Sequence, residues 1–384
     1  MAFSVSNLLL LSLFAHLTLI SSFEWPASPL DKEPLGDCPD ISLKCIPYAN
    51  LSFADQVWQG KPQEHWIREL NKEMKTKSSK LSKKMYIRDT LETVFSGEKG
   101  IFFGEKVKKG ETIGEFNPKS LISSELTAEA FKGKPYYSEH RKLFSSFKWF
   151  GNSDAVLRLT LNILYHLYHI EDSPVKSDLR ALPQNITMFG FVANDYELET
   201  LLKNDISSSF IQSIRNRTMY EFAYLRAFMP KFLSKKEMKS FLNGRDAVSP
   251  DDYAYATSIV YQRSVSDSLS LGKDEKGEET IKYFYFIPFA THYAKLRDQN
   301  LPEGGYVKTH FDNKTGDYKI QFISNDDYDK GDEFLIDYFI TENYRMLAIH
   351  GIAYKDNERE CLKLKFLEDE TTAKYQLPST FSPL

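Results

Sequence analysis

The chain has 384 residues, which is enough to bury a sizeable hydrophobic core. Hydrophobic residues make up 42%, charged residues 27% and aromatic residues 14% of it, a globular composition that excludes a disordered or collagen-like protein. A formal net charge of -4 and a pI near 6.1 argue against nucleic acid as the principal partner, because phosphate binding depends on an excess of Lys and Arg.

Residues 1–22 have the pattern of a signal peptide. Apolar residues dominate from Leu8 to Ile20, and the small residues Ser21 and Ser22 follow. The stretch is shorter than the roughly 20 apolar residues of a spanning helix. We therefore expect a mature chain that begins near Phe23, has no membrane segment and follows the secretory pathway or is extracellular. A retained anchor stays open, as does a bipartite plastid signal, which the acidic residues after Phe23 make less favoured.

Residues 23–85 are predicted to form an irregular and helical lead. Pro, Gly and Asp make residues 23–60 irregular, and a helix is expected from Gln63 to about Met74 because its apolar residues recur at helical spacing. Six lysines lie between positions 72 and 84. A solvated linker or helix face explains them better than a patch for an anionic surface.

Cysteines and sequons bear on modification. Cys38 and Cys45 are close enough for a small disulfide loop, with two unrelated thiols as the alternative. Cys361 stands in an apolar alternation typical of a buried small hydrophobe. In a secretory lumen, Asn-x-Ser/Thr sequons predict N-glycosylation at Asn50, Asn185, Asn216 and Asn313.

The rest of the chain is predicted to be one domain over residues 86–370, with a tail at 371–384. Short apolar runs separated by glycines predict hairpin-linked strands from Tyr86 to Ile122. Helical periodicity then marks an insertion at about 126–250, and strands return from Tyr283. This order predicts an α+β fold rather than alternating βαβ units. No internal repeat is evident.

Common catalytic signatures are absent from the chain. It has no P-loop, no dinucleotide-binding glycine motif and no Gly-x-Ser-x-Gly. His166 and His169 lie three residues apart on an expected helix, with Asp172 beyond them. Helical histidines of this kind are ordinarily structural, so no metal site is predicted.

The most informative features are short strings that occur in one order along the chain. They are Gly100-Ile-Phe-Phe, Lys108-Lys-Gly-Glu-Thr-Ile, Asn117-Pro-Lys-Ser-Leu, Ser173-Pro-Val-Lys-Ser-Asp-Leu-Arg-Ala-Leu-Pro, Tyr255-Ala-Thr-Ser-Ile-Val-Tyr-Gln-Arg and Asp329-Lys-Gly-Asp-Glu-Phe-Leu-Ile-Asp-Tyr. Their order and spacing resemble the SET domain of the Rubisco-lysine and actin-histidine methyltransferase branch. The resemblance implies a SET-type β-fold of short strands interrupted by a helical insertion.

The same resemblance implies chemistry and site residues. S-adenosylmethionine would be the cofactor, and a protein or peptide would be the substrate. The attacking amine must be neutral, although free lysine has a pKa of about 10.4, and an apolar channel lowers that pKa. Tyr338 would orient the amine as the catalytic tyrosine. The cofactor would be bound by Arg263, which holds its carboxylate, and by Gly100, Ile101 and Phe102.

Several positions depart from the family pattern. After the strand ending at Pro288, the family has an Asp and an Asn-His pair where this chain has Thr291, Ala294 and Lys295. Alanine cannot replace the hydrogen bonds of an Asn amide, and Lys295 adds a like charge near a sulfonium. The opening glycine motif is also reduced, because Glu98 and Lys99 precede Gly100. We therefore expect weak or lost cofactor binding.

Three interpretations follow from the sequence. The first is a SET-domain protein related to protein-lysine N-methyltransferases, either weakly active or inactive. The second is a catalytically inactive, secreted peptide- or protein-binding module on the same fold. The third is a secreted interaction protein without a SET domain. The sequence does not identify the substrate, the choice between lysine and histidine, or the oligomeric state.

Overall fold

The computed structural model describes residues 51–76, 85–89, 99–116, 122–123, 152–173, 175–184, 205–267, 283–286, 305–312, 317–334, 343–350, 361–365 and 372–376. Several predicted features lie outside these residues: the signal peptide, Cys38, Cys45, Asn50, Asn185, Asn313, Thr291, Ala294, Lys295 and Tyr338.

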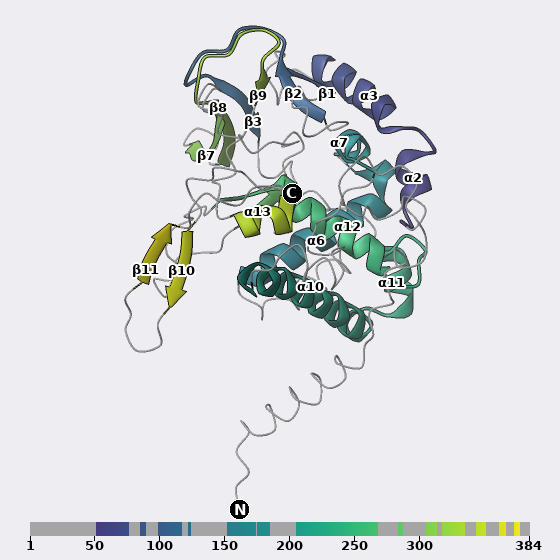
Figure 1. Cartoon of the computed structure of the whole chain (residues 1–384). Coiled ribbons are helices and arrows are strands. Elements are labelled where there is room, and N and C mark those ends of the chain that lie inside the picture. Colours follow the sequence, from purple (N-terminus) through teal and green to yellow (C-terminus); the bar gives the residue numbers. More distant parts are fainter. Residues whose placement is uncertain are drawn as a thin grey trace, which may run out of the picture.

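The helical part of the molecule is built on α6 (Asn152–Tyr168) and α12 (Pro250–Arg263), which pack against each other. The sequence of α6 is apolar nearly all round, and its Leu159, Leu161, Ile163, Leu164 and Leu167 are all 0% exposed. A helix of this kind must be covered on every side. Helix α12 also contacts α10 (Asp205–Phe232) and α13 (Asn343–His350), and the ring of Tyr165 on α6 lies 5.3 Å from that of Phe241 on α11 (Lys235–Phe241). Helix α7 (Lys176–Ala181) follows α6 in the chain (Figure 1). A 3-10 turn (Ile170–Asp172) follows α6.

The N-terminal lead is part of this helical core. Residues 23–60 were expected to be irregular, but α2 (Ala54–Trp58) is a short helix. Phe53 and Trp58 are 0% exposed, and their rings lie 5.5 Å and 5.9 Å from that of Tyr255 on α12. A five-residue helix is too short to show periodicity, so tertiary packing stabilises it.

A buried network of hydrogen bonds connects Ser52, in the N-terminal lead, to α12. The carboxylate of Asp252 is completely buried and accepts hydrogen bonds from the backbone N–H and the hydroxyl of Ser52, at 2.8 Å and 2.5 Å. Tyr168 donates a third at 2.9 Å. Arg245 donates to the Ser52 hydroxyl and carbonyl, both at 2.8 Å. Buried polar groups need such partners, so the network fixes where the lead packs.

The strands form small antiparallel sheets. One has the order β1-β2-β9, from β1 (Met85–Asp89), β2 (Lys99–Phe103) and β9 (Glu333–Phe334). A second has the order β3-β8-β7, and a third β4-β6-β5. Their strands are β3 (Thr112–Phe116), β7 (Gly305–Asp312), β8 (Asp317–Ser324), β4 (Ile122–Ser123), β5 (Ser264–Asp267) and β6 (Tyr283–Phe286). A separate hairpin pairs β10 (Cys361–Lys365) with β11 (Thr372–Gln376).

The loop between β2 and β3 and the loop between β8 and β9 form a two-fold clasp, residues 104–111 with 325–332 (Figure 1). At its centre, Val107 and Tyr328 exchange two backbone hydrogen bonds, both 2.9 Å. Equivalent glycines, Gly110 at φ 82° and Gly331 at φ 96°, turn the two loops. Each donates its N–H to the strand before the other loop.

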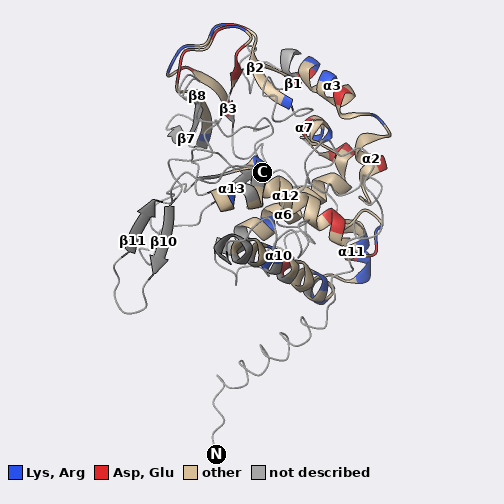
Figure 2. Cartoon of the chain, viewed as in Figure 1, with Lys and Arg blue, Asp and Glu red and all other residues tan. Residues whose placement is uncertain are grey.

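Side-chain charges join the two loops of the clasp. The first loop has three lysines and two glutamates, and the second has four aspartates and one lysine (Figure 2). Lys106 pairs with Asp329 at 2.9 Å, and Lys108 pairs with Asp327 at 3.1 Å. All four side chains are mostly exposed, so these pairs add less than the backbone bonds do.

Most predicted elements are confirmed within the described residues. The helix expected from Gln63 is α3 (Gln63–Thr76), and the strands expected at 100–103 and 112–116 are β2 and β3. The α+β class is confirmed. Strand β7 was not expected. No helix among the described residues has the length and apolar character needed to span a bilayer.

Candidate functional site

Strand β2 carries three of the residues predicted to bind the cofactor. Gly100 is buried, and Ile101 and Phe102 are 4% and 0% exposed. The strand is central in its sheet, since Ile101 lies opposite Ile87 of β1 and Phe334 of β9. Apolar side chains on a central strand bury on both faces of the sheet. The sheet thus holds this predicted site strand in one register.

Helix α3 fixes the outer edge of that sheet. The Asn71 side chain accepts from the Ile87 N–H and donates to the Ile87 carbonyl, both at 2.8 Å. The Asn71 amide thereby makes the pair of hydrogen bonds with the outer edge of β1 that a neighbouring strand would make.

Lys99 stands immediately before Gly100, where the family's glycine motif is reduced. Its side chain links α3 to β2. Its ammonium pairs with Glu64 of α3 at 3.2 Å and with Asp89 of β1. Burial alone would lower the pKa of Lys99, but its hydrogen bonds to Asp89 and Glu64 outweigh burial and raise it. The buried lysine is therefore charged and serves as a link between elements.

Gly100 lies directly against Glu333 of β9. A Cβ at position 100 would lie 2.8 Å from Cδ of Glu333 and closer still to its Oε1, and 3.2 Å from Cε2 of Phe102. The Glu333 carboxylate thus occupies the volume that a side chain on residue 100 would need. Glycine is the residue that permits this approach.

Arg263 is the last residue of α12 and is 2% exposed. The helix is well anchored at both ends. Ser249 caps its start by accepting from the Asp252 N–H at 3.0 Å, and Gln262 donates to the Ile349 carbonyl of α13 at 3.0 Å. Arg263 is consequently placed on a rigid helix next to β5.

Solved structures with the same architecture are SET domains. The SET domain of LSMT bound to lysine and AdoHcy is 16% identical, with a TM-score of 0.56, over 80% of this chain and 62% of that chain. Rubisco LSMT bound to AdoMet is 16% identical, with a TM-score of 0.52, over 80% and 60%. Rubisco LSMT bound to sinefungin and monomethyllysine is 14% identical, with a TM-score of 0.52, over 78% and 59%. The protein has a SET fold. It spans about three fifths of the length of those chains.

Sequence comparisons add no closer relationship. No protein-family model matches this SET-fold chain. No curated protein sequence matches it either. At the identities above, the structural likeness establishes the fold alone.

The described residues of this SET fold do not make an open cofactor cradle on β2. The free side of Gly100 is filled by the carboxylate of Glu333, and the next two residues are almost completely buried. Gly100 and Arg263 are positioned by different elements, the β1-β2-β9 sheet and α12. The other predicted site residues lie outside the described residues.

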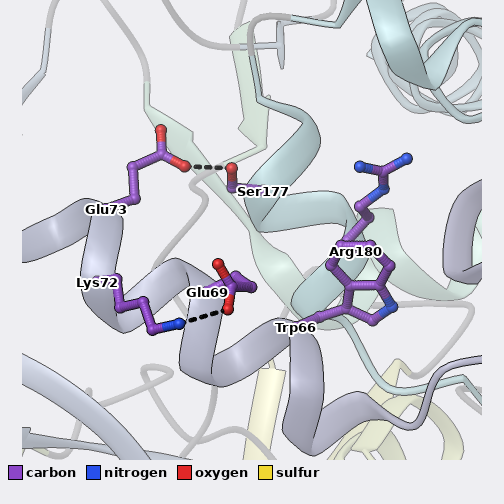
Figure 3. A pocket seen from close by; sticks show the side chains of 6 residues that line it. All are labelled: Trp66, Glu69, Lys72, Glu73, Ser177 and Arg180. Carbon is purple, nitrogen blue, oxygen red and sulfur yellow. Dashed lines mark hydrogen bonds and ion pairs between the residues drawn. The ribbon is translucent and has the colours of Figure 1, made fainter.

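A cleft between α3 and α7 was not predicted from the sequence. It has a volume of about 360 Å³ and is lined by Trp66, Glu69, Lys72, Glu73, Ser177 and Arg180 (Figure 3). The spacing of Trp66, Glu69 and Glu73 places them on one side of α3, which is the signal that could have indicated a shared surface. Their partners on α7 are distant in the sequence.

Buried ionisable groups are found in the helical part of the SET fold. Glu221 of α10 is 7% exposed; it accepts from Arg217 Nε at 2.9 Å and from the Tyr253 hydroxyl of α12 at 3.4 Å. Burial raises the pKa of Glu221 despite these donors. Burial also lowers the pKa of His166 to about 3. His169 Nε2 lies 3.0 Å from the Phe241 carbonyl. Among the described residues, no three His, Cys, Asp or Glu side chains are grouped to hold a metal.

Proposed function

We propose that this protein is related to S-adenosylmethionine-dependent protein-lysine N-methyltransferases and is either weakly active or inactive. The relationship is supported by the SET fold and by the AdoMet and AdoHcy bound to the similar structures. The observation that carries the reduced activity is the Glu333 carboxylate in the space beside Gly100. The Glu333 side chain must therefore turn aside before a cofactor can lie against β2 at Gly100.

The sequence departures support the same proposal. In it, Arg263 holds the cofactor's carboxylate and Tyr338 orients the substrate amine. Ala294 and Lys295 replace the Asn-His pair, which removes hydrogen-bonding groups and adds a cation. Each lost hydrogen bond weakens binding by about 0.5 to 1.5 kcal/mol, so cofactor affinity should be on the order of ten- to a hundredfold lower.

Calorimetry and a labelled-methyl transfer assay on three proteins test this proposal. Wild type should bind S-adenosylmethionine poorly, and the double variant Ala294→Asn/Lys295→His should regain part of the binding. Tyr338→Phe should leave the binding of wild type nearly unchanged while reducing any transfer. Tight wild-type binding with measurable transfer would show instead that this is a working enzyme.

A second proposal is a catalytically inactive, secreted binding module on the same fold. It is favoured by one structural observation, since the cleft between α3 and α7 is open while β2 is closed. The expected signal peptide agrees with it, because S-adenosylmethionine is made in the cytosol. Absence of cofactor binding in both wild type and the double variant would favour this second function.

A further inference from the structure

The cleft between α3 and α7 has two chemically different walls (Figure 3). Helix α3 contributes the carboxylates of Glu69 and Glu73, and α7 contributes the hydroxyl of Ser177 and the guanidinium of Arg180. The indole of Trp66 lies beside Arg180. At about 360 Å³, the cleft is within the lower range of pockets that hold small molecules. None of these residues belongs to the predicted cofactor site.

Arg180 is a fixed donor in the α7 wall. Its side chain is 9% exposed, and its Cζ lies 4.5 Å from the centre of the Trp66 ring. Nε donates to the Val57 carbonyl at 2.9 Å, and Nη2 donates to Glu171 at 2.5 Å. Among the described residues, Nη1 makes no hydrogen bond. A buried guanidinium held in this way offers an acceptor two N–H groups without losing further side-chain entropy.

The α3 wall has two carboxylates and the ammonium of Lys72, and one of the carboxylates can change partner. Glu69 pairs with Lys72 at 2.7 Å, but their side chains are 47% and 72% exposed. The hydrogen bond from Lys72 lowers the pKa of Glu69, so this carboxylate is ionised at neutral pH. An exposed pair of this kind is weak and can exchange for a ligand's cation. Glu73 accepts a hydrogen bond from Ser177 across the cleft.

We propose that this cleft binds a small zwitterion of the α-amino-acid class. The ligand's carboxylate accepts from Arg180 Nη1, and its ammonium donates to Glu69 and Glu73. This orientation follows from the placement of the two carboxylates on α3 and of the guanidinium on α7. A ligand that carries one charge alone would be attracted by one wall and meet an unsuitable group on the other.

Calorimetric titration of the full mature chain tests the proposal, with L-phenylalanine, phenylalaninamide and N-acetylphenylalanine as probes. The amide lacks the carboxylate, and the acetylated compound lacks the ammonium. Phenylalanine should bind at about millimolar concentration or tighter, and at least about tenfold more tightly than either analogue. Equal binding of the amide or of the N-acetyl compound would overturn the zwitterion assignment, as would the absence of phenylalanine binding.

Variants connect the binding to the cleft. Glu69→Gln and Glu73→Gln should each weaken phenylalanine binding by about three- to tenfold. The control Asp246→Asn alters another exposed acid in an ion pair, that with Lys239, and should leave binding unchanged. Unchanged binding in both cleft variants would place the ligand elsewhere and refute the site. Both cleft substitutions are at partly exposed positions, so the test does not depend on replacing the buried Arg180.

Discussion

Among single residues, Gly100 is notable because the carboxylate of Glu333 fills the space that a side chain at position 100 would need. Their strands, β2 and β9, are adjacent and pair through Ile101 and Phe334, so the two backbones are held next to each other. A side chain at position 100 would have to turn the half-buried carboxylate of Glu333 aside. Glycine at this position therefore has a packing function that holds with or without a cofactor.

Replacement of Gly100 by alanine should reveal this packing function. Gly100→Ala should lower the free energy of unfolding by about 1 kcal/mol, the low end of the cost of overpacking, because the end of the Glu333 side chain can move aside. In a Glu333→Ala background the same change should cost less, because the new Cβ then has room. Urea unfolding of the two single variants and the double variant measures this coupling. An equal cost in both backgrounds would contradict the assigned contact.

At the scale of elements, the pairing of α10 with α12 includes a buried acid. Glu221 faces Arg217 of its own helix and Tyr253 of the neighbouring one, and Tyr261 also lies within electrostatic range. Removal from water costs a carboxylate more than these donors return, which is why the pKa of Glu221 is raised from 4.5. The contact between the helices is consequently sensitive to the protonation of one group.

The stability of the protein should depend on pH through Glu221. A folded-state pKa above the unfolded value means that the native state holds the proton more tightly. The contribution is fully present below pH 4.5 and is lost as pH rises through the folded pKa. Relative to wild type, Glu221→Gln should therefore be more stable at pH 7 than at pH 4. Urea unfolding across this range checks it, with Asp246→Asn as the exposed control; a pH-independent difference would count against it.

The elements also show how much the sequence could predict. Helix α3 was predictable because Trp66, Ile67 and Leu70 recur with its own period, and β2 and β3 because glycines bound short apolar runs. Helix α2 was not, since its stability comes from contacts with α12. Local patterns identify elements, whereas contacts across the chain decide the shortest ones.

The same limit applies to the candidate sites. Gly100 was predicted to bind the cofactor, whereas the structure places it against the side chain of Glu333, a residue more than 200 positions later in the chain. Likewise, the cleft depends on Trp66 meeting Arg180, which no local spacing indicates. The sequence shows which residue types are present, but it does not show which distant residues contact each other in the fold.

At the scale of the whole molecule, the SET fold is joined to a chain with an expected signal peptide. Expression in a secreting cell should yield a mature protein that begins near Phe23 and carries N-linked glycans. N-terminal sequencing and a glycosidase mobility shift measure both. Asn216 lies within α10 rather than in a loop, so Asn216→Gln should change the shift least among the four sequon variants. An intact Met1 with no mobility shift would contradict secretion.

The two-fold clasp has a consequence for biosynthesis. Lys108 and Asp327 of the clasp are 219 positions apart, so its second loop leaves the ribosome long after the first. The helical core between them can be synthesised and packed in the meantime, and closure then requires bringing together the ends of a very long loop. Until residues 317–334 are made, β3 has no β8 and β2 has no β9 to pair with, and these two strand edges stay unpaired. Late closure therefore leaves these edges open to aggregation for most of translation.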